Sequence, residues 1–241
     1  MNLSQLLSAQ AKSLWKEAAE KPFVTEMARG CLPKDRFRRY MLQDYLYLLD
    51  YIDILTCMLS HTEDPELQAF LRGIIRGTEK ETGLVHLPNM EKMGISREEI
   101  EQCEKAEVLS EYVDYMKRAL QDGGLAAGLT ALLQCSWVYA YIGQTVTSQY
   151  ADEIEDSPYK GWFDAYTIKD YISANQAWID LVDRETADIS EERADQLCEV
   201  FVTCAGFENR FWDYLYTGGH LTSEVKCPGC PRQGQITPEV K

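Results

Sequence analysis

The chain has 241 residues, of which 45% are hydrophobic, enough to bury a substantial core. Lysine and arginine number 24 against 39 acidic residues, and the net charge of -15 argues against a nucleic-acid partner, because an acidic surface repels phosphate backbones. No apolar run long enough to cross a bilayer is predicted, and the N-terminal segment carries lysines where a signal peptide is apolar, so we expect a soluble, cytoplasmic protein with no membrane partner.

A long helix is predicted in the segment LPKDRFRRYMLQDYLYLLDYIDILTCMLSH, residues 32–61, where apolar residues recur at helical spacing. Pro33 lies where the first turn of a helix tolerates proline. The next helix is expected to begin with Asp64 as its N-cap and Pro65 as its first residue.

The stretch ETGLVHLPNM interrupts the helical pattern with Gly83 and Pro88, so we expect the helix to bend or stop there. His86, between them, is interpreted as a core or helix-terminus histidine without a catalytic role. Further on, Ser96 is followed three residues later by Glu99, the spacing of a capping box at the start of another helix.

The second half of the chain continues the helical pattern. A break at residues 123–124, both glycine, precedes the helix that contains Cys135. A final long helix is predicted from Ser190, ended by Gly218 and Gly219. No alternating strand pattern and no fixed-period repeat is visible. Because the breaks are short, we predict an all-α chain whose neighbouring helices pack antiparallel as one bundle.

The sequence predicts one helical domain over residues 1–219, followed by an irregular tail over 220–241, where prolines and glycines replace the helical period. The tail contains CPGC, with Cys227 and Cys230, which is half of a typical zinc site. Only His220 lies nearby as a further ligand, so we favour a plain tail without metal.

Polar residues on inward faces are the informative exceptions in such a bundle. Asp44, Tyr47 and Tyr51 fall on one face of the predicted helix at 32–61. Taken alone, Asp44 is as consistent with a solvated helix residue as with a site residue, and the tyrosines are consistent with core residues whose hydroxyls are satisfied.

A second carboxylate is predicted to face inward in the last helix. Glu208 has Phe211 and Trp212 at i+3 and i+4, so it shares their face. Burying an unpaired polar group costs on the order of 2–7 kcal/mol, so a partner or a function is expected. A pairing with Arg210, or with an arginine of another helix, is an equally open interpretation.

The segment ALLQCSWVYAYIG places Cys135 in an apolar, aromatic helix with Tyr139 four residues later. A buried cysteine is usually inert packing, and the residue alone does not indicate a nucleophile. The chain has no predicted export signal, so its eight cysteines are expected to be reduced thiols. We assign packing roles to Cys31, Cys57, Cys103, Cys198 and Cys204.

Three segments together resemble the TenA (thiaminase II) family. GCLPKDRFRRYMLQDYLYLLDY is similar to the family's G-x-L-P…F-x-x-Y-x-x-Q-D-Y-x-Y-L signature, LLQCSWVYAYIG to C-x-W-x-Y-x-x-x-G, and FENRFWDYLY to F-E-x-x-F-W-x-x-x-Y. The resemblance covers about residues 3–217, in order and with comparable spacing. It implies a heme-oxygenase-like helical fold, a homotetramer, and no metal, haem or other cofactor.

The resemblance also implies site residues. Asp44 matches the carboxylate that binds a ring nitrogen and the exocyclic amine of an aminopyrimidine, and Cys135 matches the nucleophile of the cysteine-containing branch. Glu208 matches the acid that protonates the opposite ring nitrogen, with Tyr139 as its hydroxyl partner. The remaining matches are pocket aromatics: Tyr47, Tyr112 and, in a less firmly aligned segment, Tyr166.

The resemblance implies hydrolysis of thiamine or of its degraded aminopyrimidine derivatives, releasing 4-amino-5-hydroxymethyl-2-methylpyrimidine for thiamine salvage. Two alternatives stay open. A non-haem metal oxygenase on the same fold would need several histidines around iron, whereas the chain has only three. A non-catalytic, pyrimidine-binding regulatory protein would keep the pocket without turnover.

Overall fold

The computed structural model describes residues 2–219, and every regular element in that part of the chain is helical, which confirms the predicted fold class. The elements are α1 (Leu3–Glu20), α2 (Pro22–Ala28), α3 (Lys34–Ser60), α4 (Pro65–Glu81), the π-helix η1 (Thr82–His86), α5 (Leu87–Lys92), α6 (Arg97–Gln102), α7 (Glu107–Gln149), α8 (Ala151–Glu155), α9 (Lys160–Thr167), α10 (Lys169–Glu185) and α11 (Glu191–Thr217).

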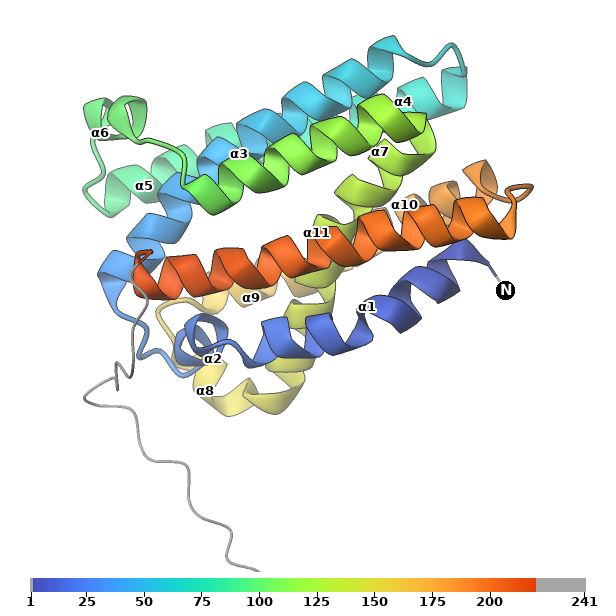
Figure 1. Ribbon diagram of the computed structural model, residues 1–241. Helices are drawn as coiled ribbons and strands as arrows, with labels where there is room; N and C mark the ends of the chain where they lie inside the picture. The colour runs from blue at the N-terminus through green and yellow to red at the C-terminus, as the bar shows by residue number, and fades with distance from the viewer. Residues whose placement is uncertain (1, 220–241) are drawn as a thin grey trace, which may run out of the picture.

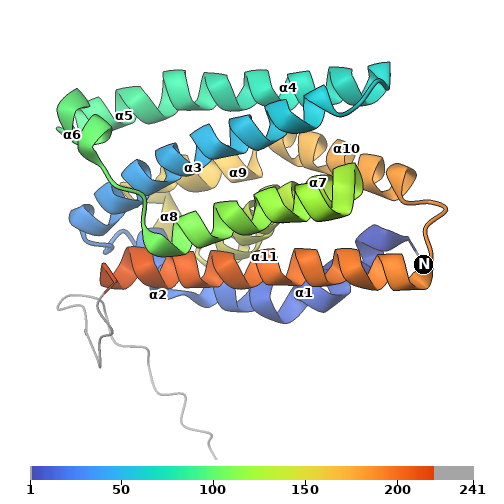
Figure 2. The ribbon, with the colours of Figure 1, turned by 45° about the horizontal axis from the view of Figure 1, so that its top comes forward.

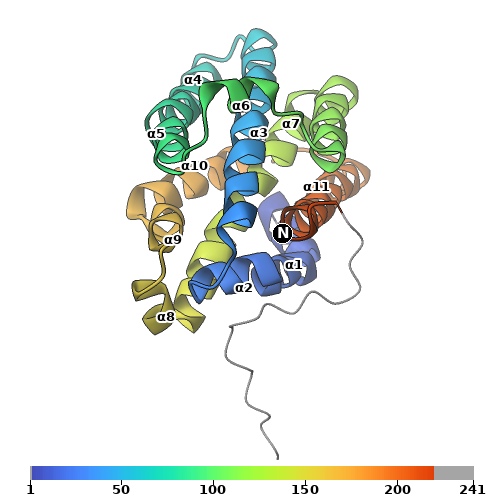
Figure 3. The same ribbon diagram turned by 90° about the vertical axis from the view of Figure 1, so that its left-hand side faces the viewer.

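The long helices form one bundle. α11 packs between α1 and α7, and α3 packs against both α4 and α7 (Figure 1). Turning the molecule shows α4 along one edge and α1 with α11 along the other, with α3 and α7 between them (Figure 2). Seen end-on, α4 and α5 lie on one side of α3, and α7 and α11 on the other (Figure 3).

The predicted helix starts are confirmed by their caps. The side-chain oxygens of Asp64, Ser96 and Ser190 each accept a hydrogen bond from a backbone amide in the first turn of their helix. The capping box at Ser96 is only half formed, because the carboxylate of Glu99 binds Arg38 of α3 instead of returning to the Ser96 amide. This pairing ties α6 to α3.

The expected interruption around Gly83 and Pro88 takes the form of a π-helix rather than a stop. Pro88 has no amide hydrogen, so the carbonyl of Leu84 loses the partner that an α-helix would give it. The chain responds with one wider turn, η1, and then resumes as α5. This turn changes which face the following residues present, and it brings His86 into the buried interior.

The predicted break at residues 123–124 is a sharp kink within α7. Gly124 has φ 64° and ψ -165°, a conformation open to glycine and strongly disfavoured for other residues. The kink turns the second half of α7 across the bundle, behind α11 (Figure 1). Cys135 lies on that second half, so the kink determines where its side chain points.

We predict that Gly124→Ala destabilises the protein by about 1–3 kcal/mol in urea unfolding, because alanine is strained at this φ and ψ. A Cβ at Gly124 would meet no atom within 4 Å, so the effect would be purely conformational. Gly206→Ala is the matched control: it also lies in open space, but within regular α11, and should gain up to about 1 kcal/mol. Equal effects at the two positions would contradict this account.

α7 also corrects a prediction about membranes. By length and composition it could span a bilayer, with a window of mean hydropathy 1.4, although none was expected from the sequence. However, 67% of that window is buried inside the protein, as in the core helix of a globular bundle.

The cysteine predictions have mixed outcomes. Cys198 and Cys204 are buried in the core, as expected for packing residues. Cys57 is exposed, so its packing assignment is wrong. The predicted tail, 220–241, with its whole CPGC stretch, lies outside the described residues.

Candidate active site

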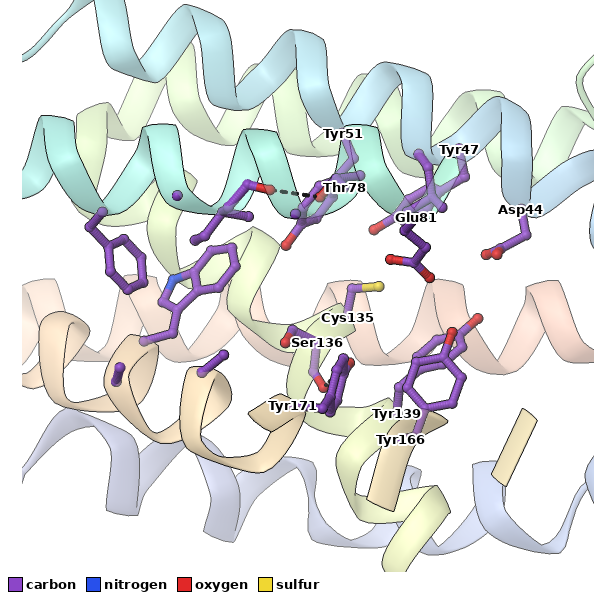
Figure 4. Close-up of a pocket in the computed structure, with 18 of the residues that line it drawn as sticks. Asp44, Tyr47, Tyr51, Thr78, Glu81, Cys135, Ser136, Tyr139, Tyr166 and Tyr171 are labelled. Carbon is purple, nitrogen blue, oxygen red and sulfur yellow. Dashed lines mark hydrogen bonds between the residues drawn. The ribbon is translucent and has the colours of Figure 1, made fainter. Parts of the chain in front are cut away.

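A cavity of about 490 Å³ opens between α3, α4, α7, α9 and α10. Its polar and aromatic lining gathers Asp44, Tyr47 and Tyr51 of α3, Thr78 and Glu81 of α4, Cys135, Ser136 and Tyr139 of α7, Tyr166 of α9 and Tyr171 of α10 (Figure 4). Most of the surface is carbon, as expected for a site that binds a flat organic ring and orients it with a few polar groups.

Small residues line the outer part of the cavity. Gly73 and Gly77 of α4 face Ala174 and Ala177 of α10 across the cavity, and all four are exposed. A Cβ added at either glycine would meet nothing within 4 Å. This part of the cavity, between α4 and α10, therefore reaches the surface of the single chain.

Cys135 presents its sulfur to this cavity (Figure 4). Burial raises the pKa of its thiol well above the ordinary value, and the charge of Glu208 raises it further, while a hydrogen bond with Tyr47 lowers it. The free protein therefore holds a protonated thiol at neutral pH. A thiolate has to be generated when a ligand is bound.

The residue after the cysteine is held rigidly. The backbone carbonyl of Ser136 accepts hydrogen bonds from Asn175 Nδ2 at 2.7 Å and from the Tyr171 hydroxyl at 3.0 Å. Asn175 Nδ2 also lies 2.8 Å from Ser136 Oγ. These bonds from α10 fix the backbone next to Cys135, which favours a pre-organised sulfur position.

Glu208 lies behind the cavity wall, next to Cys135 and 2% exposed, and within the described residues it forms no ion pair with Arg210 or with an arginine of another helix. Arg210 instead binds Glu111. Burial raises the pKa of Glu208 to about 7, although polar contacts with Tyr112 and Cys135 lower it. A carboxyl group that is about half protonated at neutral pH can act as an acid.

The hydroxyl partner of Glu208 differs from the predicted one. The Tyr112 hydroxyl, not that of Tyr139, donates to Glu208 Oε1 at 3.1 Å. Tyr112 does not line the cavity: its ring stacks on Tyr47 at 5.6 Å and on Phe207 at 5.3 Å. In this structure it contacts Tyr47 and Glu208 from behind, and its assignment to the ring site stays a prediction.

Tyr139 and Tyr166 do line the cavity, with ring centroids 4.9 Å apart. Gly143 allows this arrangement, because a Cβ there would lie 3.0 Å from the Cβ of Tyr166. Burial raises the pKa of both phenols well above the ordinary value, so they remain neutral hydrogen-bonding groups. Together they form the aromatic floor on one side of the sulfur (Figure 4).

Asp44 is 5% exposed, so it is not a solvated helix residue. Its Oδ2 lies 2.7 Å from Nε2 of the buried His86. Among the described residues, no group donates a hydrogen bond to Oδ1, which leaves that oxygen available to a ligand. Residues 2–219 contain no group of three or more potential metal ligands close enough together to hold an ion.

Comparisons with known proteins show which family the chain belongs to. The sequence model of the TENA/THI-4/PQQC family matches residues 8–218. The chain belongs to the TENA/THI-4/PQQC family. It is 28% identical to an aminopyrimidine aminohydrolase of Helicobacter pylori, over 90% of this chain and 99% of that protein. It is 29% identical to an aminopyrimidine aminohydrolase of Halalkalibacterium halodurans, over 90% and 96%.

The fold of this TENA/THI-4/PQQC protein is likewise found in solved structures. A TenA homologue from P. horikoshii has a TM-score of 0.81 and 27% identity, over 91% of this chain and 100% of that one. A protein described as a TenA family transcription regulator, from Silicibacter sp., also has a TM-score of 0.81, with 25% identity, over 89% and 96%.

Two ionisable residues of this family member were missed in the sequence. His86 was assigned no role, yet it contacts Asp44 directly. Glu81 was not singled out, although it ends α4 on the cavity wall. The signal that could have found them is Pro88: a proline inside a helical pattern indicates a local irregularity, and irregular helical turns often lie at functional sites.

The pairing of His86 with Asp44 predicts a pH-dependent contribution to stability. Burial alone would lower the pKa of His86, but the hydrogen bond and charge of Asp44 and the charge of Glu81 outweigh it, so the pKa rises above 6.5. A histidine whose pKa is higher in the folded than in the unfolded protein stabilises the folded state. This contribution is fully present below pH 6.5 and is lost as pH rises through the pKa of the folded protein.

We therefore expect His86→Leu to destabilise the protein by about 3–5 kcal/mol at about pH 6, because one partner of a buried pair is removed, and by less at about pH 9. Urea unfolding at the two pH values measures this. His61→Leu, at the exposed end of α3, is the control and should change little at either pH. A loss that is the same at both pH values would rule out a charged pair.

Proposed function

We propose that this protein is an aminopyrimidine hydrolase of thiamine metabolism that releases 4-amino-5-hydroxymethyl-2-methylpyrimidine. One observation carries the proposal: Asp44 and Cys135 face the same aromatic cavity, with the raised-pKa carboxyl of Glu208 next to the sulfur. The names of the Helicobacter and Halalkalibacterium relatives support the same chemistry.

The cavity suits an aminopyrimidine ring. Asp44 Oδ1 accepts a hydrogen bond from the exocyclic amine, while His86 holds Oδ2. Tyr47, Tyr139 and Tyr166 pack against the ring faces. Glu208 sits on the side of Cys135, so it meets the ring nitrogen opposite the one that Asp44 reads.

The residues then divide the reaction between them. Glu208 gives its proton to the ring nitrogen, which makes the adjacent ring carbon electrophilic, and it takes up the thiol proton as the sulfur of Cys135 bonds to that carbon. The leaving group departs from the exocyclic methylene with its bonding electron pair. Water adds to the methylene and loses a proton to the departed leaving group or to solvent. The carbon–sulfur bond then breaks, while Glu208 returns a proton to the sulfur and takes one back from the ring nitrogen. No cofactor takes part in this proposal.

Turnover assays test the function. Purified protein is incubated with thiamine, with the aminomethylpyrimidine and with its formylamino derivative, and the hydroxymethylpyrimidine is quantified. Product from any of the three supports the proposal. Tight binding without product would favour a regulatory protein instead, and stoichiometric iron in purified, active protein would favour the oxygenase alternative.

We also propose that the protein is a homotetramer that acts in the cytoplasm. Leu84 and Val85 of η1, Leu87 of α5 and Ile168 are large apolar residues that are exposed in the single chain, which favours a subunit interface over them. A nucleophilic thiol also favours a reducing compartment. Light scattering that gives the mass of a monomer would contradict the tetramer.

A further inference from the structure

Glu81 is a carboxylate in the cavity that has no role in the proposed reaction. It is the last residue of α4, it is partly buried, and its carboxylate projects into the cavity between the sulfur of Cys135 and the carboxylate of Asp44 in the view of Figure 4. Within residues 2–219, no hydrogen bond or ion pair holds this carboxylate, which is unusual for an acidic side chain away from bulk water.

The charges around Glu81 leave its own charge unmatched. The negative charge of Asp44 is paired with His86 at 2.7 Å. The other ionisable groups that line the cavity have pKa values raised by burial, so they stay neutral: Tyr47, Tyr51, Cys135, Tyr139, Tyr166 and Tyr171. Glu81 also borders a second cavity, where Lys34 and Lys92 are exposed and make no ion pair with it.

The proposed ring orientation places the leaving group at Glu81. In an aminopyrimidine of this class, the ring carbon that carries the exocyclic methylene stands between the carbon that carries the amine and the carbon that the thiolate attacks. With the amine at Asp44 and the attacked carbon at Cys135, the methylene substituent points to the space between these two residues. Glu81 occupies that space (Figure 4).

We propose that Glu81 is a specificity-determining residue that binds a positively charged leaving group through its carboxylate. This inference rests on the proposed function and names its substrate class: pyrimidines whose exocyclic methylene carries an ammonium or a thiazolium nitrogen, in preference to a neutral amide. A primary alkyl amine stays protonated at neutral pH, as the lysine side chain does, so the aminomethyl compound meets Glu81 as a cation.

The preference for a substrate with a cationic leaving group should depend on pH. Burial raises the pKa of Glu81 to about 7, the charge of Asp44 adds to the rise, and the charge of His86 opposes it. The carboxylate form therefore becomes dominant as pH rises through about 7, and KM for a cationic substrate should fall over that interval. KM for a neutral substrate should not follow this trend.

The test compares KM for the aminomethylpyrimidine and for its neutral formylamino derivative in wild type, Glu81→Gln and Glu79→Gln. Glu79 is on the same helix, exposed and away from the cavity, so its variant is the matched control. For Glu81→Gln we expect KM for the cationic compound to rise about 10- to 100-fold, as for the loss of one charge-assisted hydrogen bond. In this variant, KM for the cationic compound should also lose its pH dependence around 7, and KM for the neutral compound should stay within about twofold of wild type.

Equal changes in both KM values, or no change in either, would overturn the inference, with circular dichroism used to verify that each variant is folded. If wild type turned over neither compound, the proposed function would fail. Dissociation constants for the same two compounds would then be measured by calorimetry on the same variants. A rise in the dissociation constant of the cationic compound alone, in Glu81→Gln, would still support the inference, and equal changes for both compounds would overturn it.

Discussion

Cys135→Ser is expected to lower kcat for every aminopyrimidine substrate by at least about 1,000-fold while leaving substrate binding within about threefold, because the nucleophile is lost but the cavity is kept. Serine has nearly the shape of cysteine, but its hydroxyl is far less acidic than even a buried thiol. It cannot add to the ring with only Glu208 to take its proton. Single-turnover kinetics and calorimetry measure the two quantities separately.

Two further observations make this result specific to the sulfur. Cys57→Ser removes an exposed thiol near the C-terminal end of α3 that does not line the cavity, and should retain full activity. A mass shift equal to the pyrimidine-methyl group, trapped on Cys135 in denatured wild type, would support the covalent step. Undiminished turnover by Cys135→Ser would eliminate it.

Glu208→Gln is the second large effect. We expect kcat to fall by about 100- to 10,000-fold, the range for the loss of a general acid, with KM little changed. The amide keeps the shape of the side chain and can still accept the Tyr112 hydroxyl, but it has no acidic proton to give. Glu199→Gln, exposed on the same helix, is the control and should behave as wild type.

The pH dependence of kcat tests the same role of Glu208 as an acid. Because Glu208 acts in its protonated form and its pKa is about 7, wild-type kcat should decline as pH rises above about 7. The residual rate of Glu208→Gln should lack that decline. A raised carboxyl pKa also means that folding is disfavoured as pH rises from 4.5 through about 7, because the charged form is buried. The variant should therefore be at least as stable as wild type at neutral pH, so poor folding would not explain its low activity.

The sequence by itself determined the helices, their caps and the inward faces. Apolar spacing located α3 and α11, and side-chain chemistry located the starts at Asp64 and Ser190. The same spacing placed Glu208 on the buried face of Phe211 and Trp212, because periodicity along one helix depends only on that helix, but it left Asp44 equally consistent with a solvated position. Resemblance to a family then indicated which of these residues belong to one site.

Tertiary structure alone decided which groups meet. Tyr112 rather than Tyr139 reaches Glu208, because the kink at Gly124 turns the two halves of α7 differently toward α11. His86 reaches Asp44, and Glu81 reaches the cavity, across the π-helical turn that shifts the phase of the helix. Helical periodicity fixes the direction of a side chain only relative to its own axis, and it is lost at each irregular turn. The contacts between helices therefore follow from how the whole bundle packs.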